Sequence, residues 1–66
     1  MKIKWEKQRD KSYFGVDEDG NTYKKTANLE TVTCFLAPTH NYYGQAWDED
    51  TALKRALKAK EKWESI

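Results

Sequence analysis

Cysteine, proline and glycine are all scarce in this sequence. The single cysteine, Cys34, excludes an intramolecular disulfide, which many small secreted domains need for stability. With one proline and three glycines, the chain has no proline- or glycine-rich linker that would separate two domains. The 66 residues therefore predict one domain over residues 1–66 and a reducing, cytoplasmic location.

Long apolar runs and an excess of charge are also missing. No run approaches the ~18 apolar residues of a membrane-spanning helix, and residues 1–7 lack the apolar stretch of a signal peptide. We therefore expect no membrane partner. Twelve Lys and Arg side chains against eleven Asp and Glu give a net charge of +1, so the chain lacks the strongly basic character typical of nucleic-acid-binding domains.

Aliphatic side chains are few, and aromatic side chains replace them. Leu, Ile, Val and Phe together number ten of 66 residues, a proportion that would favour disorder if the net charge were large. Three Trp, four Tyr and two Phe residues compensate, because each aromatic side chain can bury about 150–250 Å². We therefore predict a folded domain whose core is built largely from aromatic residues.

Segments with strand-forming patterns precede the helix. Period-two alternation in residues 2–8 predicts a strand with Ile3 and Trp5 facing the core. Phe14 and Val16 are expected to face the core from the next strand. The predicted strands are 2–8, 12–17, 22–26, 31–37 and a short one at 42–46, and the segment 27–30 is either a connection or a bulge.

Residues 49–64 form the clearest predicted element, a helix. Asp48 is suited to cap its start, and Glu49 and Asp50 complement the positive end of the helix dipole. Trp63 is expected to close the core at the helix end, so that its replacement by Ala would cost about 3–5 kcal/mol. The sequence predicts an α+β fold in which one C-terminal helix packs on an antiparallel sheet of three to four strands. The apolar stripe that would face this sheet comprises Ala52, Leu53, Ala56, Leu57, Ala59 and Trp63.

The acidic segment Asp17–Asn21 has the composition of a calcium-binding loop. A loop of the EF-hand kind needs Gly at its sixth position and Glu at its twelfth, where this chain has Thr22 and Asn28. The Asp-Gly and Gly-Asn steps favour a solvated hairpin turn, because Gly and Asn tolerate positive φ. A zinc site needs three or four ligands, which Cys34 and His40 do not supply without carboxylates. We therefore expect no metal and no other cofactor.

Cys34 and His40 are the one combination that suggests nucleophilic catalysis. Pro38 separates them, and no acidic residue is clearly placed to orient the imidazole. Cys34 also lies in the middle of a predicted strand, where small buried thiols are common. A structural cysteine and a loop histidine are the preferred interpretation, and we predict that the chain is not an enzyme.

Two groups of side chains are candidates for binding a partner. Basic side chains on the helix, opposite the apolar stripe, would neutralise phosphates of RNA or DNA, although a solvated outer helix face is the usual explanation of such charges. This first group comprises Lys54, Arg55, Lys58 and Lys62. The second group consists of aromatic residues of the kinds enriched at protein interfaces, Tyr23, Tyr42, Tyr43 and Trp47. Because one helix covers only some of the aromatic residues, several are expected on the open face of the sheet, where a partner protein or a second copy in a homodimer would bind.

The segment Tyr43–Leu57 runs from a strand through an acidic cap into an Ala- and Leu-rich helix. This order resembles the strand-to-helix step of the HicB-type antitoxin domain, a β-β-β-α fold that is similar in part to double-stranded-RNA-binding domains. In size and in its lack of a catalytic motif, the chain is also similar to small phage-encoded proteins that block host machinery by docking on it. These resemblances imply a non-enzymatic protein-binding module of the inhibitor or antitoxin type, encoded by a phage or another mobile element. The alternative is a small RNA- or DNA-binding protein that uses the basic helix face.

Overall fold

The computed structural model of this chain describes residues 2–26 and 30–64 and has the predicted α+β class. The sheet has five strands, one more than the upper number predicted, because the short segment before the helix joins the sheet as a full member. The predicted connection or bulge at 27–30 falls largely on 27–29, which lie outside the described residues. The elements are β1 (Ile3–Lys7), β2 (Tyr13–Asp17), β3 (Thr22–Lys25), β4 (Val32–Phe35), β5 (Tyr43–Ala46) and α1 (Glu49–Glu64).

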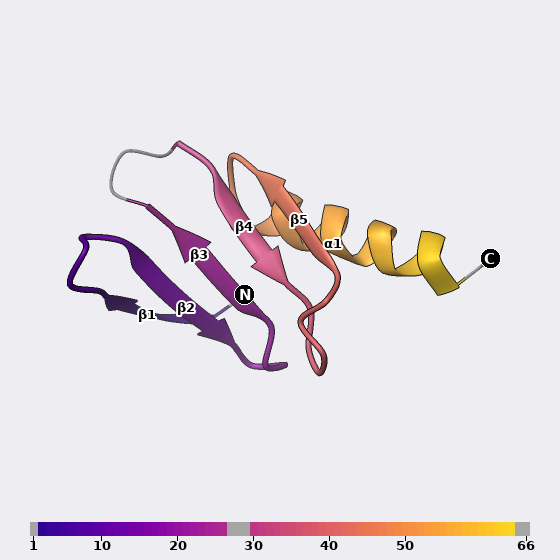
Figure 1. Cartoon of the computed structure of the whole chain (residues 1–66), viewed down its shortest axis with the longest axis horizontal. Helices are drawn as coiled ribbons and strands as arrows, with labels where there is room; N and C mark the ends of the chain where they lie inside the picture. The colour runs from indigo at the N-terminus through magenta and orange to yellow at the C-terminus, as the bar shows by residue number, and fades with distance from the viewer. Residues whose placement is uncertain (1, 27–29, 65–66) are drawn as a thin grey trace.

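The five strands form one antiparallel sheet in chain order, β1-β2-β3-β4-β5. Each strand pairs with the next one along the chain, so β1 and β5 are the two edges (Figure 1). The register aligns one residue from every strand in a row across the sheet. This row is Trp5, Gly15, Tyr23, Cys34 and Gly44. Because side chains alternate between faces, the row defines the side of the sheet on which the helix lies.

Small residues bring α1 into close contact with the sheet. Ala52 and Ala56 are fully buried, and α1 packs against β5 and β4. A Cβ atom added at Gly44 would lie 2.6 Å from the carbonyl oxygen of Ala52, so only glycine fits at this crossing. The core therefore lies between α1 and the β3–β5 half of the sheet. Its buried members are Tyr23, Val32, Cys34, Leu36, Ala46, Ala52 and Ala56. Tyr23 is the one aromatic residue among them, so the prediction of a largely aromatic core is wrong, because close packing of α1 on the sheet selects small side chains.

The C-terminal half of α1 extends past the edge of the sheet (Figure 1). Trp63 lies there with 67% of its surface exposed, so the prediction that it closes the core is wrong. The periodicity placed Trp63 correctly on the stripe that contains Ala52 and Ala56. The sheet ends at β5, however, and offers nothing for the last turns of the stripe to pack against.

The predicted inward faces are right for β1 and wrong for β2. Ile3 packs against the core. Trp5 shares its face, with its ring centre 6.4 Å from that of Tyr23, but it is 38% exposed because α1 does not extend over β1. Phe14 and Val16 instead lie on the opposite face, 40% and 38% exposed. Gly15, between them, is the residue that faces the helix side, because Ile3 and Trp5 fill the space that a side chain would need at this position.

Candidate binding surfaces

The face of the sheet opposite α1 is uncovered by any helix or strand of the described chain, residues 2–26 and 30–64. Val32 and Cys34 are buried on the helix side, so their neighbours Thr33 and Phe35 must point to the other side. The same alternation applied through the strand register defines what we call the open face. It consists of Lys4, Glu6, Phe14, Val16, Thr22, Lys24, Thr33, Phe35, Tyr43 and Gln45.

Large apolar side chains form a band across the open face. Val16 pairs with Thr22, which pairs with Phe35, which in turn pairs with Tyr43. The rings of Phe35 and Tyr43 have their centres 6.1 Å apart. Phe14, on β2, adds a third aromatic ring to the open face. The band crosses four neighbouring strands, β2 to β5, whose backbones are fixed by the hydrogen bonds of the sheet.

The four aromatic residues predicted to bind a partner occupy different environments. Tyr43 and Trp47 are 62% and 68% exposed, one on the open face and the other directly after β5. Tyr42 is half-buried and packs against the core. Tyr23 is fully buried on the central strand, on the side that faces the helix, and is therefore excluded from any docking surface.

Sequence patterns missed Phe14, Val16 and Phe35 as members of the open face. A usable signal was present in the alternation within each strand, because Gly15 and Cys34 alternate with these residues and both are small. Small residues are what a closely packed interior face requires, so their large neighbours belong to the other side.

Asp17 has a structural role that its place in an acidic turn concealed. Its Oδ1 accepts hydrogen bonds from the backbone N–H groups of Asp19 (2.9 Å) and Asn21 (3.0 Å). Its Oδ2 accepts from Nδ2 of Asn21 (3.1 Å) and from the Tyr23 hydroxyl (2.6 Å). Burial by itself would raise the pKa of this carboxyl, but the hydrogen bonds from Tyr23 and Asn21 outweigh it, so the pKa lies below its ordinary value. The segment is a hairpin turn, as predicted, with a carboxylate that anchors it to the core.

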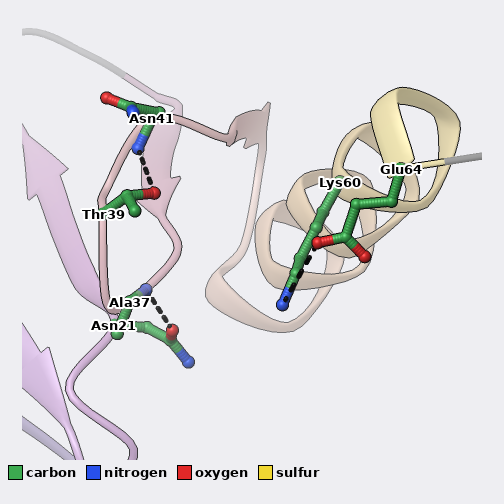
Figure 2. Close-up of polar contacts among 6 residues, drawn as sticks. All are labelled: Asn21, Ala37, Thr39, Asn41, Lys60 and Glu64. Carbon is green, nitrogen blue, oxygen red and sulfur yellow. Dashed lines mark hydrogen bonds and ion pairs between the residues drawn. The ribbon is translucent and has the colours of Figure 1, made fainter.

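The same turn is attached to the end of β4. Asn21 Oδ1 accepts a hydrogen bond from the backbone N–H of Ala37 at 2.9 Å (Figure 2). His40 is exposed, has a φ of 60°, and its Nε2 lies 3.1 Å from the carbonyl oxygen of Gly20. Side chains from both loops therefore fix the β2–β3 turn against the β4–β5 connection.

Cys34 and His40 occupy environments unsuited to a shared catalytic role. Cys34 is fully buried, and that burial raises the pKa of its thiol. His40 is exposed in the β4–β5 connection, beside the turn at Gly20. Among residues 2–26 and 30–64, no group of three or more His, Cys, Asp and Glu side chains is arranged to hold a metal ion.

The four basic residues predicted on the helix are all exposed and lie on one side of α1. Helical geometry places Lys54, Lys58, Lys62 and Arg55 within an arc of roughly 100°. Arg55 Nη1 donates a hydrogen bond to the backbone carbonyl of Gln45 at 2.8 Å, so this side chain lies against the edge of β5. A shallow hollow of about 690 Å³ lies on the same side of the helix, and Glu61 places a carboxylate in its lining.

A second hollow, of about 870 Å³, lies beside the turn between β1 and β2. Asp10 is part of its lining, and its Oδ1 accepts hydrogen bonds from both the backbone N–H and the hydroxyl of Ser12. These bonds lower the pKa of the Asp10 carboxyl and hold the turn together. The carboxylate is therefore committed to the local structure.

The surfaces of this chain are the basis for assigning it a role. No protein-family model, curated protein or solved structure gives a significant match to this chain. Within the part of the chain that the structure describes, no helix has the length and apolar character needed to cross a membrane. The apolar open face and the basic side of α1 are the two surfaces to be weighed.

Proposed function

We propose that this chain is a non-enzymatic protein-binding module of the inhibitor or antitoxin type, which docks its open face on a partner protein and occludes it. The observation that carries the proposal is the band of Phe14, Val16, Phe35 and Tyr43 on a face that no described element covers. The backbone that carries these side chains is already fixed by sheet pairing, so little backbone conformational entropy is lost when a partner binds. Exposed apolar patches of this kind mark interaction sites.

The charges around the band define the chemistry of the partner. Lys4 and Lys24 lie on the open face beside Val16 and Phe14, and Glu6 is the one carboxylate among them. We infer that the partner presents an apolar patch bordered by carboxylates, because complementary charges at the rim select the partner and orient it. The resemblance to the HicB-type strand-to-helix step supports the antitoxin form of the proposal. A cytoplasmic location and a phage or mobile-element origin belong to the same proposal.

Capture of a partner from host lysate tests the role of the open face. Tyr43→Ala and Phe14→Ala should each reduce capture at least about tenfold, since aromatic anchors commonly dominate an interface. Leu57→Ala is the matched control, because Leu57 is an exposed apolar residue on α1. It should leave capture unchanged. Equal capture by all three variants, each shown to be folded by circular dichroism, would contradict the proposal.

A small RNA- or DNA-binding protein is the second candidate. It is favoured by the exposed arc of Lys54, Arg55, Lys58 and Lys62, which faces away from the apolar stripe. Glu61 adds a negative charge beside the basic residues, and the hydrogen bond to Gln45 holds Arg55 against the edge of β5. Both reduce the positive surface available to phosphates. Nuclease treatment of the lysate separates the candidates, because capture through nucleic acid is lost and capture through the open face is retained.

A further inference from the structure

The two edges of the sheet differ in how they are protected from pairing with another strand. β1 carries Lys4, Glu6 and Lys7, and charged side chains are a common device against edge-to-edge association. β5, with the sequence YGQA, carries no charged residue. At its outer edge, Arg55 donates a hydrogen bond to the carbonyl oxygen of Gln45.

That hydrogen bond also shows which backbone groups of β5 are available. The Gln45 carbonyl accepts from a side chain outside the sheet, so it points away from β4. In an antiparallel strand, the N–H and C=O of one residue point to the same side, and every second residue repeats the direction. Gln45 and Tyr43 therefore present their backbone donors and acceptors along the outer edge of β5.

Beside this edge, the overhanging part of α1 forms a shelf with an unused apolar stripe. Trp63 follows Ala56 by about two helical turns and so shares the direction of the alanines that contact the sheet. Beyond β5, however, no strand of the described chain lies over the last turns of α1 (Figure 1). Ala59 lies one turn earlier on the same stripe and is half-buried. The shelf and the open edge adjoin one another.

We propose that β5 of a second copy of this chain occupies this position, so that two copies form an antiparallel, two-fold symmetric dimer with one continuous sheet. Trp63 of each protomer then lies beneath the sheet of its partner, and the two helices run antiparallel side by side. The first turn of α1 is acidic, at Glu49 and Asp50, and its last turn carries one basic residue, Lys62, between Glu61 and Glu64. An antiparallel pair places each Lys62 near the acidic first turn of the partner helix and aligns the two helix dipoles favourably.

Dimer formation replaces one side-chain hydrogen bond at the β5 edge with several backbone hydrogen bonds between the two copies. Arg55 releases Gln45, and the backbone groups along the β5 edge gain ladder partners from the second copy. The two-fold axis stands perpendicular to the sheet, so both open faces lie on the same side of the dimer. This arrangement is inferred independently of the docking function, and it would present two copies of the docking face to one partner surface.

Sedimentation equilibrium over about 1 µM to 1 mM protein tests the dimer. The wild type should approach twice the chain mass of 7.8 kDa. Gln45→Lys should raise the dissociation constant at least about tenfold, because it sets like charges opposite each other across the axis. Trp63→Ala should raise it by a similar factor by removing the shelf contact. Gln8→Lys, the same substitution just beyond β1, should leave the dimer unchanged.

Two further measurements keep the test decisive. The melting temperature of the wild type should rise with protein concentration, as linkage requires for a dimer, whether or not a variant folds. Phe14→Ala should keep the dimer even where it abolishes partner capture, so a failure of the docking proposal is visible separately. A wild type that stays monomeric to about 1 mM overturns the dimer. So does a dimer that Gln45→Lys and Trp63→Ala, both folded, leave intact.

Discussion

Asp17 illustrates how one side chain can connect a turn to a core. Its carboxylate satisfies two backbone N–H groups of the turn and also accepts from the buried hydroxyl of Tyr23. Burial and this hydrogen bond to Asp17 raise the pKa of the Tyr23 phenol, which therefore stays protonated and remains a donor. The thiol of Cys34 lies next to the same hydroxyl. The hairpin and the centre of the sheet are thus linked through one carboxylate.

Asp17→Asn should lower the free energy of unfolding at pH 7 by about 2 kcal/mol. The reason is that the partly buried donors on Asn21 and Tyr23 would lose their hydrogen bonds to a charged acceptor. The pH dependence has a definite sign. The folded-state pKa of Asp17 lies below the ordinary value of 3.8, so its contribution is present above that pH and is lost as the pH falls through the folded pKa. Urea denaturation at pH 7 and in steps below pH 4 should show wild-type stability falling toward that of the variant.

Asp19→Asn is the control for this experiment, because Asp19 is an exposed residue of the same turn. It should change stability by no more than about 0.5 kcal/mol at any of these pH values. An Asp17→Asn variant as stable as the control would show that the hydrogen bonds to this carboxylate contribute nothing net.

Among the elements, the crossing of β5 and α1 determines the architecture. Gly44 and Ala46 on the strand face Ala52 and Ala56 on the helix, so the two backbones approach closely. This close approach draws the helix toward one edge of the sheet and leaves its last turns, with Trp63, beyond that edge. Lys60 and Glu64, 4.0 Å apart on the overhang, form an ion pair within the helix (Figure 2).

Gly44→Ala should destabilise the fold by about 3 kcal/mol, the upper range for forcing extra atoms into a packed interior. The added methyl group meets helix backbone around Ala52 and Ala56, which cannot turn aside as a flexible side chain would. Urea denaturation of the variant measures the effect. Gln45→Ala, one residue along and exposed, should cost well under half as much, and equal losses from the two substitutions would argue against this close contact.

At the scale of the whole molecule, the fold separates an apolar surface from a basic one. The open face carries the aromatic band, whereas the basic arc lies on the side of α1 away from the stripe that packs on the sheet. The two candidate functions therefore use different surfaces. Lys54, Lys58 and Lys62 can be replaced without touching the open face, whereas Arg55 also contacts the backbone of Gln45.

Reversing Lys54, Arg55, Lys58 and Lys62 to Glu should leave capture of a protein partner through the open face within about twofold of wild type, because these side chains lie off that face. Binding to duplex DNA by the wild type should be weak at physiological salt. If four phosphate contacts carried the function, log K would fall with log salt at a slope of about −3.6, and the variant would lose that binding for all sequences alike. Fluorescence anisotropy at several salt concentrations measures the slope, and tight, salt-sensitive binding by the wild type would favour the nucleic-acid candidate.

Local patterns in the sequence were sufficient for the class of the fold and for most of its elements. The helix at 49–64, its cap at Asp48 and the hairpin turn at Asp17–Asn21 depend on neighbours within a few residues, and the structure confirms all three. Asp48 Oδ1 accepts from the backbone N–H of Thr51 at 2.8 Å, as an N-cap should. Such features can be read from spacing because their energetics are local.

Tertiary structure alone decided which side of each strand faces the helix and where the helix ends relative to the sheet. Alternation in β2 is equally compatible with either face, and packing of Ile3 and Trp5 over Gly15 selected the one that exposes Phe14. Helical periodicity likewise placed Trp63 on the packing stripe without showing that the sheet stops short of it. The burial of Tyr23 and the exposure of Trp63 follow from the position of α1 across β4 and β5, which depends on contacts between residues far apart in the chain.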